Sequence, residues 1–104
     1  MADQARFSVG QLIQHRRFGY RGVIVDVDAV FRGTEEWYQT MARSRPPKDQ
    51  PWYHVLVDGA DYHTYVAERH LEADNSGRPV NHPQVDEYLR RGADGRYHLR
   101  TRAN

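Results

Sequence analysis

The chain has 104 residues and a formal net charge of +1, with 38% hydrophobic and 12% aromatic residues. This length predicts one domain with a single small core, and the charge is too near neutral to predict nucleic-acid binding by itself. The absence of cysteine excludes disulfides and thiolate metal sites. No apolar run approaches the ~18 residues that span a bilayer. The N-terminal stretch lacks the apolar core of a signal peptide, so we expect a cytoplasmic protein.

The N-terminal third predicts two strands after a frayed start over residues 1–6. The first covers residues 11–16, and a turn with two aromatic residues and two glycines follows it. The second covers residues 22–30 and is the most β-branched stretch of the chain. In it Asp26 and Asp28 alternate with valines, which predicts one buried face and one face that carries carboxylates.

The period then changes to that of a helix over residues 34–43. Thr34 is a suitable N-cap, and glutamates follow it in the first turn, where the helix dipole favours them. The apolar stripe predicted to face inward consists of Trp37, Tyr38 and Met41. A proline pair places residues 44–50 in a loop. Helix and loop together are an insertion between the second and third strands.

A β-hairpin is the strongest local signal in the chain. Residues 52–57 and 62–66 are runs of strand-forming residues, and the Asp-Gly pair at 58–59 between them is a strong turn signal. A turn centred on residues 59–60 places His54 opposite Tyr65 and His63 opposite Leu56. The two histidines then lie on the same face of the hairpin, offset by two residues.

The C-terminal part predicts shorter elements. Residues 67–71 suggest one helical turn, after which the chain closes the sheet, and residues 81–89 suggest a short helix with Pro83 in its first turn. Residues 97–99 suit a weak strand or an extended tail that is rich in arginine from Arg90 onward. The whole pattern predicts a mainly β protein: a single domain over residues 1–104, ordered from about 7 to 97. Its expected fold is a small SH3-like antiparallel barrel of about five strands with the inserted helix and a short C-terminal helix.

Two side-chain groups raise the question of metal binding or catalysis. His54 and His63 lie close enough to share a metal, but the pattern places no third ligand near them, and the alternative is that His54 packs beside Tyr65. Asp26 and Asp28 share one strand face and suit acid–base work or a cation. The alternatives for them are protection of an exposed strand edge or ion pairs with Arg21 and Arg69.

The turn between the first two strands combines arginines with aromatic rings, namely Arg16, Arg17, Phe18, Tyr20 and Arg21. Such a patch can hold phosphates while a ring meets a base, or it can anchor a protein partner. The third alternative is a solvated turn whose rings cap the barrel. No nucleophile elbow and no phosphate-binding glycine loop is present, so we expect neither an enzyme nor a bound cofactor.

Several motifs together resemble those of the HspQ/YccV-like hemimethylated-DNA-binding family. The matching segments are Phe7–Gln11, His15–Asp28, Asp49–Val55, Thr64–Glu68 and Asn81–Pro83. The resemblance runs from about residue 7 to 97, and the combination of segments is specific although each segment alone is weak. The resemblance implies an SH3-like barrel and a small, non-enzymatic, heat-shock-associated regulator of bacteria.

The resemblance also implies partners. It implies a specificity factor for the Lon protease that affects the stability of the replication initiator DnaA, or alternatively a module with affinity for hemimethylated DNA. Self-association is implied as well. We take seven residues from the turn patch and the hairpin as candidate contacts with protein or DNA: Arg16, Arg17, Tyr20, Arg21, Trp52, His54 and Tyr65.

Overall fold

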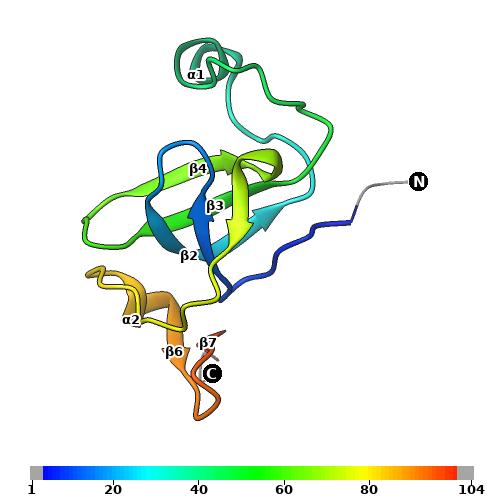
Figure 1. Ribbon diagram of the computed structural model, residues 1–104. Helices are drawn as coiled ribbons and strands as arrows, with labels where there is room; N and C mark the ends of the chain where they lie inside the picture. The colour runs from blue at the N-terminus through cyan, green and yellow to red at the C-terminus, as the bar shows by residue number, and fades with distance from the viewer. Residues whose placement is uncertain (1–3, 101–104) are drawn as a thin grey trace.

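Five strands form one antiparallel sheet in the computed structural model, which describes residues 4–100 (Figure 1). The sheet order is β4-β3-β2-β1-β5, so β4 and β5 are its edges. The strands are β1 (Leu12–His15), β2 (Arg21–Asp28), β3 (Trp52–Val57), β4 (His63–Ala67) and β5 (Leu71–Ala73). The prediction of a mainly β, small barrel-like fold is confirmed.

Strand β2 contains a bulge that decides where its carboxylates lie. Ile24 pairs with Val55, but the next pair is Asp26 with His54, so Val25 is the extra residue. Asp28 then lies opposite Trp52. A bulge of this kind re-aims the side chains that follow it. Because β2 lies in the middle of the sheet, the predicted role of the two aspartates in protecting an exposed strand edge is wrong.

The β3–β4 hairpin has the predicted register. His54 lies opposite Tyr65, and Leu56 lies opposite His63. Gly59 in the turn has a φ of 79°, in the left-handed region that glycine adopts without strain. The two histidines therefore do share one face, with their ring centroids 6.2 Å apart.

Three groups of buried side chains hold the molecule together. The first fills the inside of the curved sheet and includes Ile13, Ile24 and Tyr53, all fully buried. The second packs Val23 and Leu56 against the C-terminal elements. The third joins the inserted helix to the sheet through Tyr38, Ala42, Trp52 and Ala67. Each face of β3 therefore contributes to a core.

The inserted helix α1 (Glu35–Met41) stands at one end of the molecule, above the sheet in Figure 1. Thr34 caps it as predicted, because its Oγ1 accepts a hydrogen bond of 3.0 Å from the Trp37 amide. Tyr38 is buried, but Met41, predicted to face inward, is 63% exposed. Tyr38 and Ala42 are one helical turn apart and form the buried face, so Met41 points away from the sheet.

The C-terminal elements differ most from the prediction. After the 3₁₀ turn Glu68–His70, helix α2 covers only Val85–Tyr88. The start of the arginine-rich stretch is not an extended tail. Its strands β6 (Leu89–Arg91) and β7 (Tyr97–Leu99) form a second small sheet. It is fixed by the fully buried Leu89 and by the Tyr97 hydroxyl, which accepts a hydrogen bond of 3.0 Å from the Val80 amide. None of the helices in residues 4–100 has the length and apolar character to cross a membrane.

Candidate functional site

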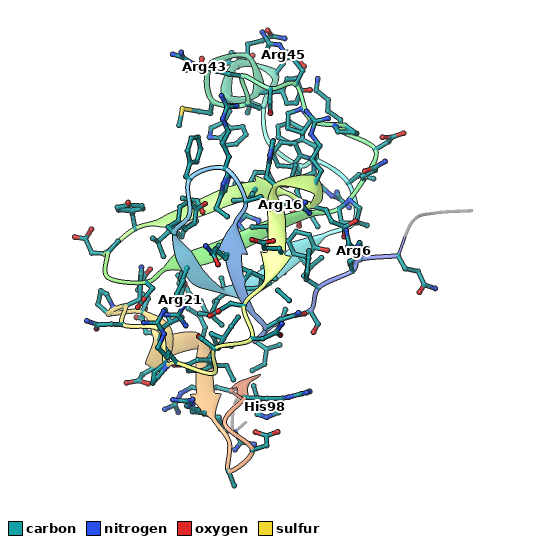
Figure 2. The ribbon with its side chains drawn as sticks, viewed as in Figure 1. Arg6, Arg16, Arg21, Arg43, Arg45 and His98 are labelled. Carbon is teal, nitrogen blue, oxygen red and sulfur yellow. The ribbon has the colours of Figure 1, made fainter. Side chains whose placement is uncertain are left out.

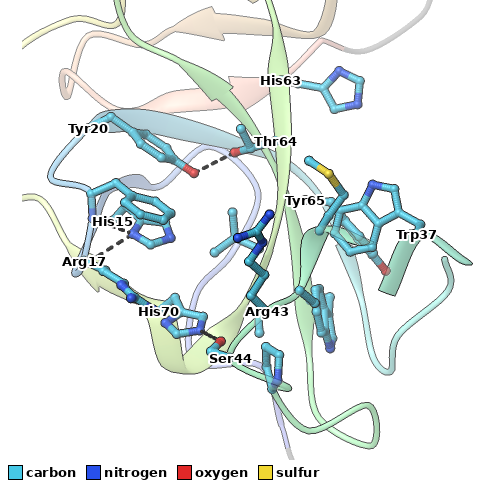
Figure 3. A pocket seen from close by; sticks show the side chains of 17 residues that line it. His15, Arg17, Tyr20, Trp37, Arg43, Ser44, His63, Thr64, Tyr65 and His70 are labelled. Atoms are coloured by element: carbon cyan, nitrogen blue, oxygen red, sulfur yellow. Dashed lines mark hydrogen bonds between the residues drawn. The ribbon is translucent and has the colours of Figure 1, made fainter. Parts of the chain in front are cut away.

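A cleft of about 590 Å³ lies between α1, the β1–β2 turn and strand β4 (Figure 3). Five consecutive residues of β4, His63–Ala67, line it. Because neighbouring side chains of a strand point to opposite faces, one hollow can meet all five only by running along the strand's edge. That edge is free, since β4 pairs with β3 alone among the described strands.

The charged side chains described in the lining of the cleft are all basic. Its lining contains two arginines, Arg17 and Arg43, and three histidines, His15, His63 and His70, but no aspartate or glutamate among the described residues. Both arginines are exposed. They come from different elements: Arg17 from the β1–β2 turn and Arg43 from the loop after α1 (Figures 2 and 3). A ligand with negative charge suits this lining.

His15 holds the β1–β2 turn in place from beneath. It is 6% exposed, and its Nδ1 accepts hydrogen bonds from the amides of Arg17 and Phe18, at 3.1 and 3.0 Å. Its ring stacks on His70 with centroids 5.6 Å apart. Burial, and then the neighbouring His70 and Arg17, lower the pKa of His15. Burial and the nearby Arg69 and Arg17 likewise lower the pKa of His70. Both rings therefore favour the neutral form, and the arginines carry the positive charge here.

Aromatic rings form the apolar wall of the cleft. Trp52 is 1% exposed, and its Nε1 donates a hydrogen bond of 3.0 Å to the Pro47 carbonyl. Trp37 packs edge-on against Tyr65 with centroids 5.6 Å apart. Tyr65 in turn lies 5.2 Å from Trp52. The rings of the wall contact one another, and the polar atoms of Trp52 and Tyr65 are hydrogen-bonded.

The β1–β2 turn supplies the opposite side. The Tyr20 hydroxyl lies 2.8 Å from Thr64 Oγ1, which joins the turn to the edge of β4. Burial raises the pKa of Tyr20. Phe18 is 72% exposed although it stacks on His15 with centroids 4.6 Å apart. An exposed ring fixed at the rim of a cleft is a typical contact residue.

The structure divides the predicted turn patch. Arg17 and Tyr20 line the cleft, whereas Arg16 is exposed outside it. Arg21 points elsewhere: its Nη1 and Nε each form a 2.8 Å ion pair, with Asp58 and Asp74, and its side chain is only 12% exposed. Figure 2 shows Arg16 and Arg21 well apart. Arg21 therefore stabilises the fold and does not contribute to the cleft.

Other partners also differ from the expectation. The predicted ion pairs of Asp26 and Asp28 with Arg21 and Arg69 are absent from the described residues, and Arg69 Nη2 instead donates to the Ser44 carbonyl at 2.7 Å. His54 does not line the cleft. Its Nε2 lies 3.2 Å from Asp28 Oδ2, and Tyr65 donates to the same oxygen at 2.7 Å.

Sequence reasoning missed several cleft residues as contact candidates. Arg43 follows the inserted helix, and no local sequence pattern encodes where that helix lies relative to the sheet. Trp37 was predicted to be a core residue of the same helix. The sequence pattern indicated His63 only as a partner of His54. The one available signal was the clustering of arginine with aromatic residues at both 16–21 and 37–45.

The fold and the cleft define a small barrel-like binding domain whose aromatic cleft is positively charged. The chain matches the family model "Hemimethylated DNA-binding protein YccV like" over residues 5–96. This match covers most of the chain, which therefore belongs to the YccV-like family. The resemblance drawn from the sequence motifs is confirmed.

Proposed function

We propose that this protein is a non-enzymatic DNA-binding module that prefers hemimethylated duplexes, with the cleft as its contact surface. One observation carries the proposal: Arg17 and Arg43 flank an aromatic wall, and the described lining contains no carboxylate. Arginine suits phosphate oxygens through two parallel hydrogen bonds. The aromatic wall suits a base edge and its methyl group, and the family description names the same ligand.

The geometry sets the expected magnitudes. Two arginines that release about two counterions give a log–log salt slope near −2, far below that of strongly basic binders. One methyl group buried against aromatic rings contributes about 0.8 kcal/mol, which is about a fourfold preference. Salt should weaken the phosphate contacts and leave this preference intact.

The test is fluorescence anisotropy on one duplex in unmethylated, hemimethylated and fully methylated forms, across a salt series. We expect the hemimethylated form to bind about four times more tightly than the unmethylated form, and this ratio should persist as salt rises. Methylation-blind binding that disappears with salt would refute the proposal.

A matched pair of variants locates the surface. Arg17→Ala/Arg43→Ala should weaken binding to all three duplexes and reduce the salt slope by about two. The control, Arg90→Ala/Arg96→Ala, removes the same charge from exposed positions of the C-terminal hairpin and should change affinity little. Equal losses in both variants would show that general charge, rather than the cleft, holds the DNA.

A second candidate function is supported by the free edge of β4. An extended peptide can add to such an edge as a strand, and the exposed Phe18 and Met41, at 72% and 63%, offer apolar contacts. From this edge, together with the family resemblance of the sequence motifs, we infer an adaptor role in the cytoplasm: a heat-shock-associated specificity factor that presents substrates, DnaA among them, to the Lon protease.

The adaptor role is tested by the rate at which purified Lon degrades DnaA with and without this protein. Faster degradation that is lost in Phe18→Ser supports the role, because Phe18 is exposed and the change should leave folding intact. An unchanged rate would remove this candidate and leave the DNA proposal standing.

A further inference from the structure

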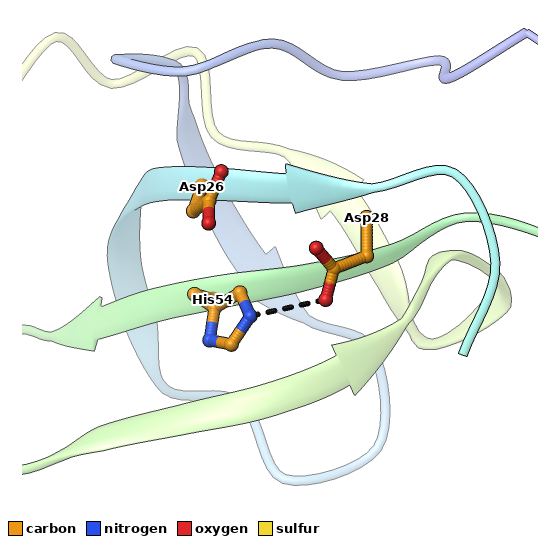
Figure 4. Close-up of side chains that lie close together, drawn as sticks. All are labelled: Asp26, Asp28 and His54. Carbon is orange, nitrogen blue, oxygen red and sulfur yellow. Dashed lines mark hydrogen bonds and ion pairs between the residues drawn. The ribbon is translucent and has the colours of Figure 1, made fainter. Parts of the chain in front are cut away.

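Two carboxylates and one imidazole converge on the outer face of the sheet, at a place separate from the cleft arginines (Figure 4). Asp26, Asp28 and His54 each offer one ligand atom, and these atoms all lie within 4.8 Å of one another. We propose that this cluster, called the β2–β3 site below, binds a divalent transition-metal ion.

The fold builds the site through the bulge in β2. Without the extra residue Val25, every later residue of β2 would shift by one position against β3 and present its other face. With it, Asp26 lies directly opposite His54, and Asp28 shares the face two residues on. The site therefore depends on a bulge that the sequence pattern did not predict.

The donor spacing suits a metal ion. His54 Nε2 and Asp28 Oδ2 are 3.2 Å apart. Metal–ligand bonds to imidazole and carboxylate are about 2.0–2.2 Å, so two neighbouring ligands of one ion lie roughly 3.0–3.5 Å apart. An ion can thus bridge His54 and Asp28 with small movements, and rotation of the exposed Asp26 side chain completes the set.

The Asp28 carboxylate is held in position by groups outside the cluster, and Asp26 has one bond to the neighbouring backbone. The Tyr65 hydroxyl donates to Asp28 Oδ2 at 2.7 Å and accepts from the Arg32 amide at 3.0 Å. Asp26 Oδ1 accepts from the Val27 amide at 2.9 Å. Hydrogen bonds of this kind orient metal ligands and lower the cost of binding.

A second hollow, which shares His63 with the lining of the cleft, gives the site access to solvent and a fourth ligand. It measures about 260 Å³ and is lined by Asp26 and His54 together with His63. His63 is exposed and its ring lies 6.2 Å from that of His54. A rotation of His63 toward the hollow would give two imidazoles and two carboxylates, and water can occupy any remaining position.

The chemistry of the donors indicates the class of ion. One or two imidazoles with two carboxylates suit Zn²⁺, Ni²⁺ or Mn²⁺ better than the all-oxygen preference of Ca²⁺. Within residues 4–100 neither aspartate forms an ion pair with arginine or lysine. The negative charge of the pair is therefore free for a cation.

The test is isothermal titration of the full chain with ZnCl₂, with chemical denaturation in parallel to check folding. We expect one saturable Zn²⁺ site, with affinity reduced at least tenfold in Asp26→Asn and in His54→Asn. Asp26→Asn is the sharper variant, because this exposed residue bonds only to the backbone next to it and its change should not disturb folding.

The C-terminal hairpin offers a matched control. Asp94 and His98 form an exposed histidine–carboxylate pair at 3.4 Å, outside any three-residue ligand cluster among the described residues. Asp94→Asn should leave Zn²⁺ affinity unchanged. Absence of saturable binding, or affinity that Asp26→Asn does not reduce, or equal loss in Asp94→Asn, would overturn the proposal. DNA binding plays no part in this readout, so the two proposals fail or succeed separately.

Discussion

At the scale of single residues, partners rather than residue type decide what an arginine does. Arg17 and Arg21 lie four positions apart, but Arg17 is exposed at the cleft. Arg21 bonds Asp58, Asp74 and the Arg78 carbonyl, with the last bond at 2.7 Å. Burial by itself raises the pKa of Asp74, yet the bonds from Arg21 and Ser76 reverse this and lower it. The pair thus stabilises the ionised carboxylate and the loop that carries it.

Arg21→Met should therefore destabilise the fold by about 3 kcal/mol, because it leaves two partly buried carboxylates without their partner. Urea denaturation at pH 7 measures this free energy of unfolding. Arg90→Met, at an exposed position, is the control and should change it by no more than about 0.5 kcal/mol. If both variants lower the free energy of unfolding by the same small amount, Arg21 is not structural and is again a candidate contact residue.

The sequence predicted part of the candidate site for identifiable reasons. Trp52 and Tyr65 followed from the hairpin, whose register depends on a local turn. Arg43 was missed because its position depends on how the inserted helix docks. The prediction did not bring Asp26 and Asp28 close to His54. The reason is that the pairing of β2 with β3 crosses a long insertion and includes a bulge, and no local pattern encodes either.

At the scale of elements, close backbone contact fixes the C-terminal hairpin to the segment just before β1. Gly10 has a φ of 89°, and a Cβ there would lie 2.1 Å from the Tyr97 carbonyl oxygen. Its own amide donates to the Ile24 carbonyl at 2.8 Å. The sequence did not predict the β6–β7 sheet because its strands show no alternation of apolar and polar residues. The sheet is instead held by contacts with this backbone and with the buried Val80.

Gly10→Ala and Gly59→Ala form a matched pair, because both glycines have positive φ but a Cβ at Gly59 meets nothing within 4 Å. Gly59→Ala should cost about 1 kcal/mol from backbone strain alone. Gly10→Ala should cost at least about 2 kcal/mol more, since the hairpin must move. Urea denaturation gives both values, and similar losses at the two positions would contradict the contact with Tyr97.

At the scale of the whole molecule, the net charge of +1 conceals a local concentration of positive charge. The arginines labelled in Figure 2 lie apart from one another, from Arg43 and Arg45 near α1 to Arg21 lower in the view, but the cleft combines two arginines with no described carboxylate. The composition gave only the expectation of modest affinity for nucleic acid. It could not reveal a cleft assembled from three separate segments.

The stacked pair His15–His70 makes the stability of the whole molecule depend on pH. In the folded state the pKa of each ring is lowered from 6.5, chiefly by burial. Below pH 6.5 the unfolded chain takes up protons that the folded chain resists, so the free energy of unfolding should fall as the pH decreases through this window. Above pH 6.5 both states hold neutral rings, and this contribution stays constant.

Urea denaturation at pH 7.5, 6.5 and 5.5 measures this dependence. His70→Gln should flatten it, because one of the two rings that resist protonation is removed while a group able to bond Ser44, now 2.8 Å from His70 Nε2, remains. His98→Gln, whose side chain is 46% exposed, should retain the slope of the unchanged protein. A stability that is the same at pH 7.5 and 5.5 would show that the histidine pair accepts protons freely, and the assignment of the cleft's charge to Arg17 and Arg43 alone would no longer hold at low pH.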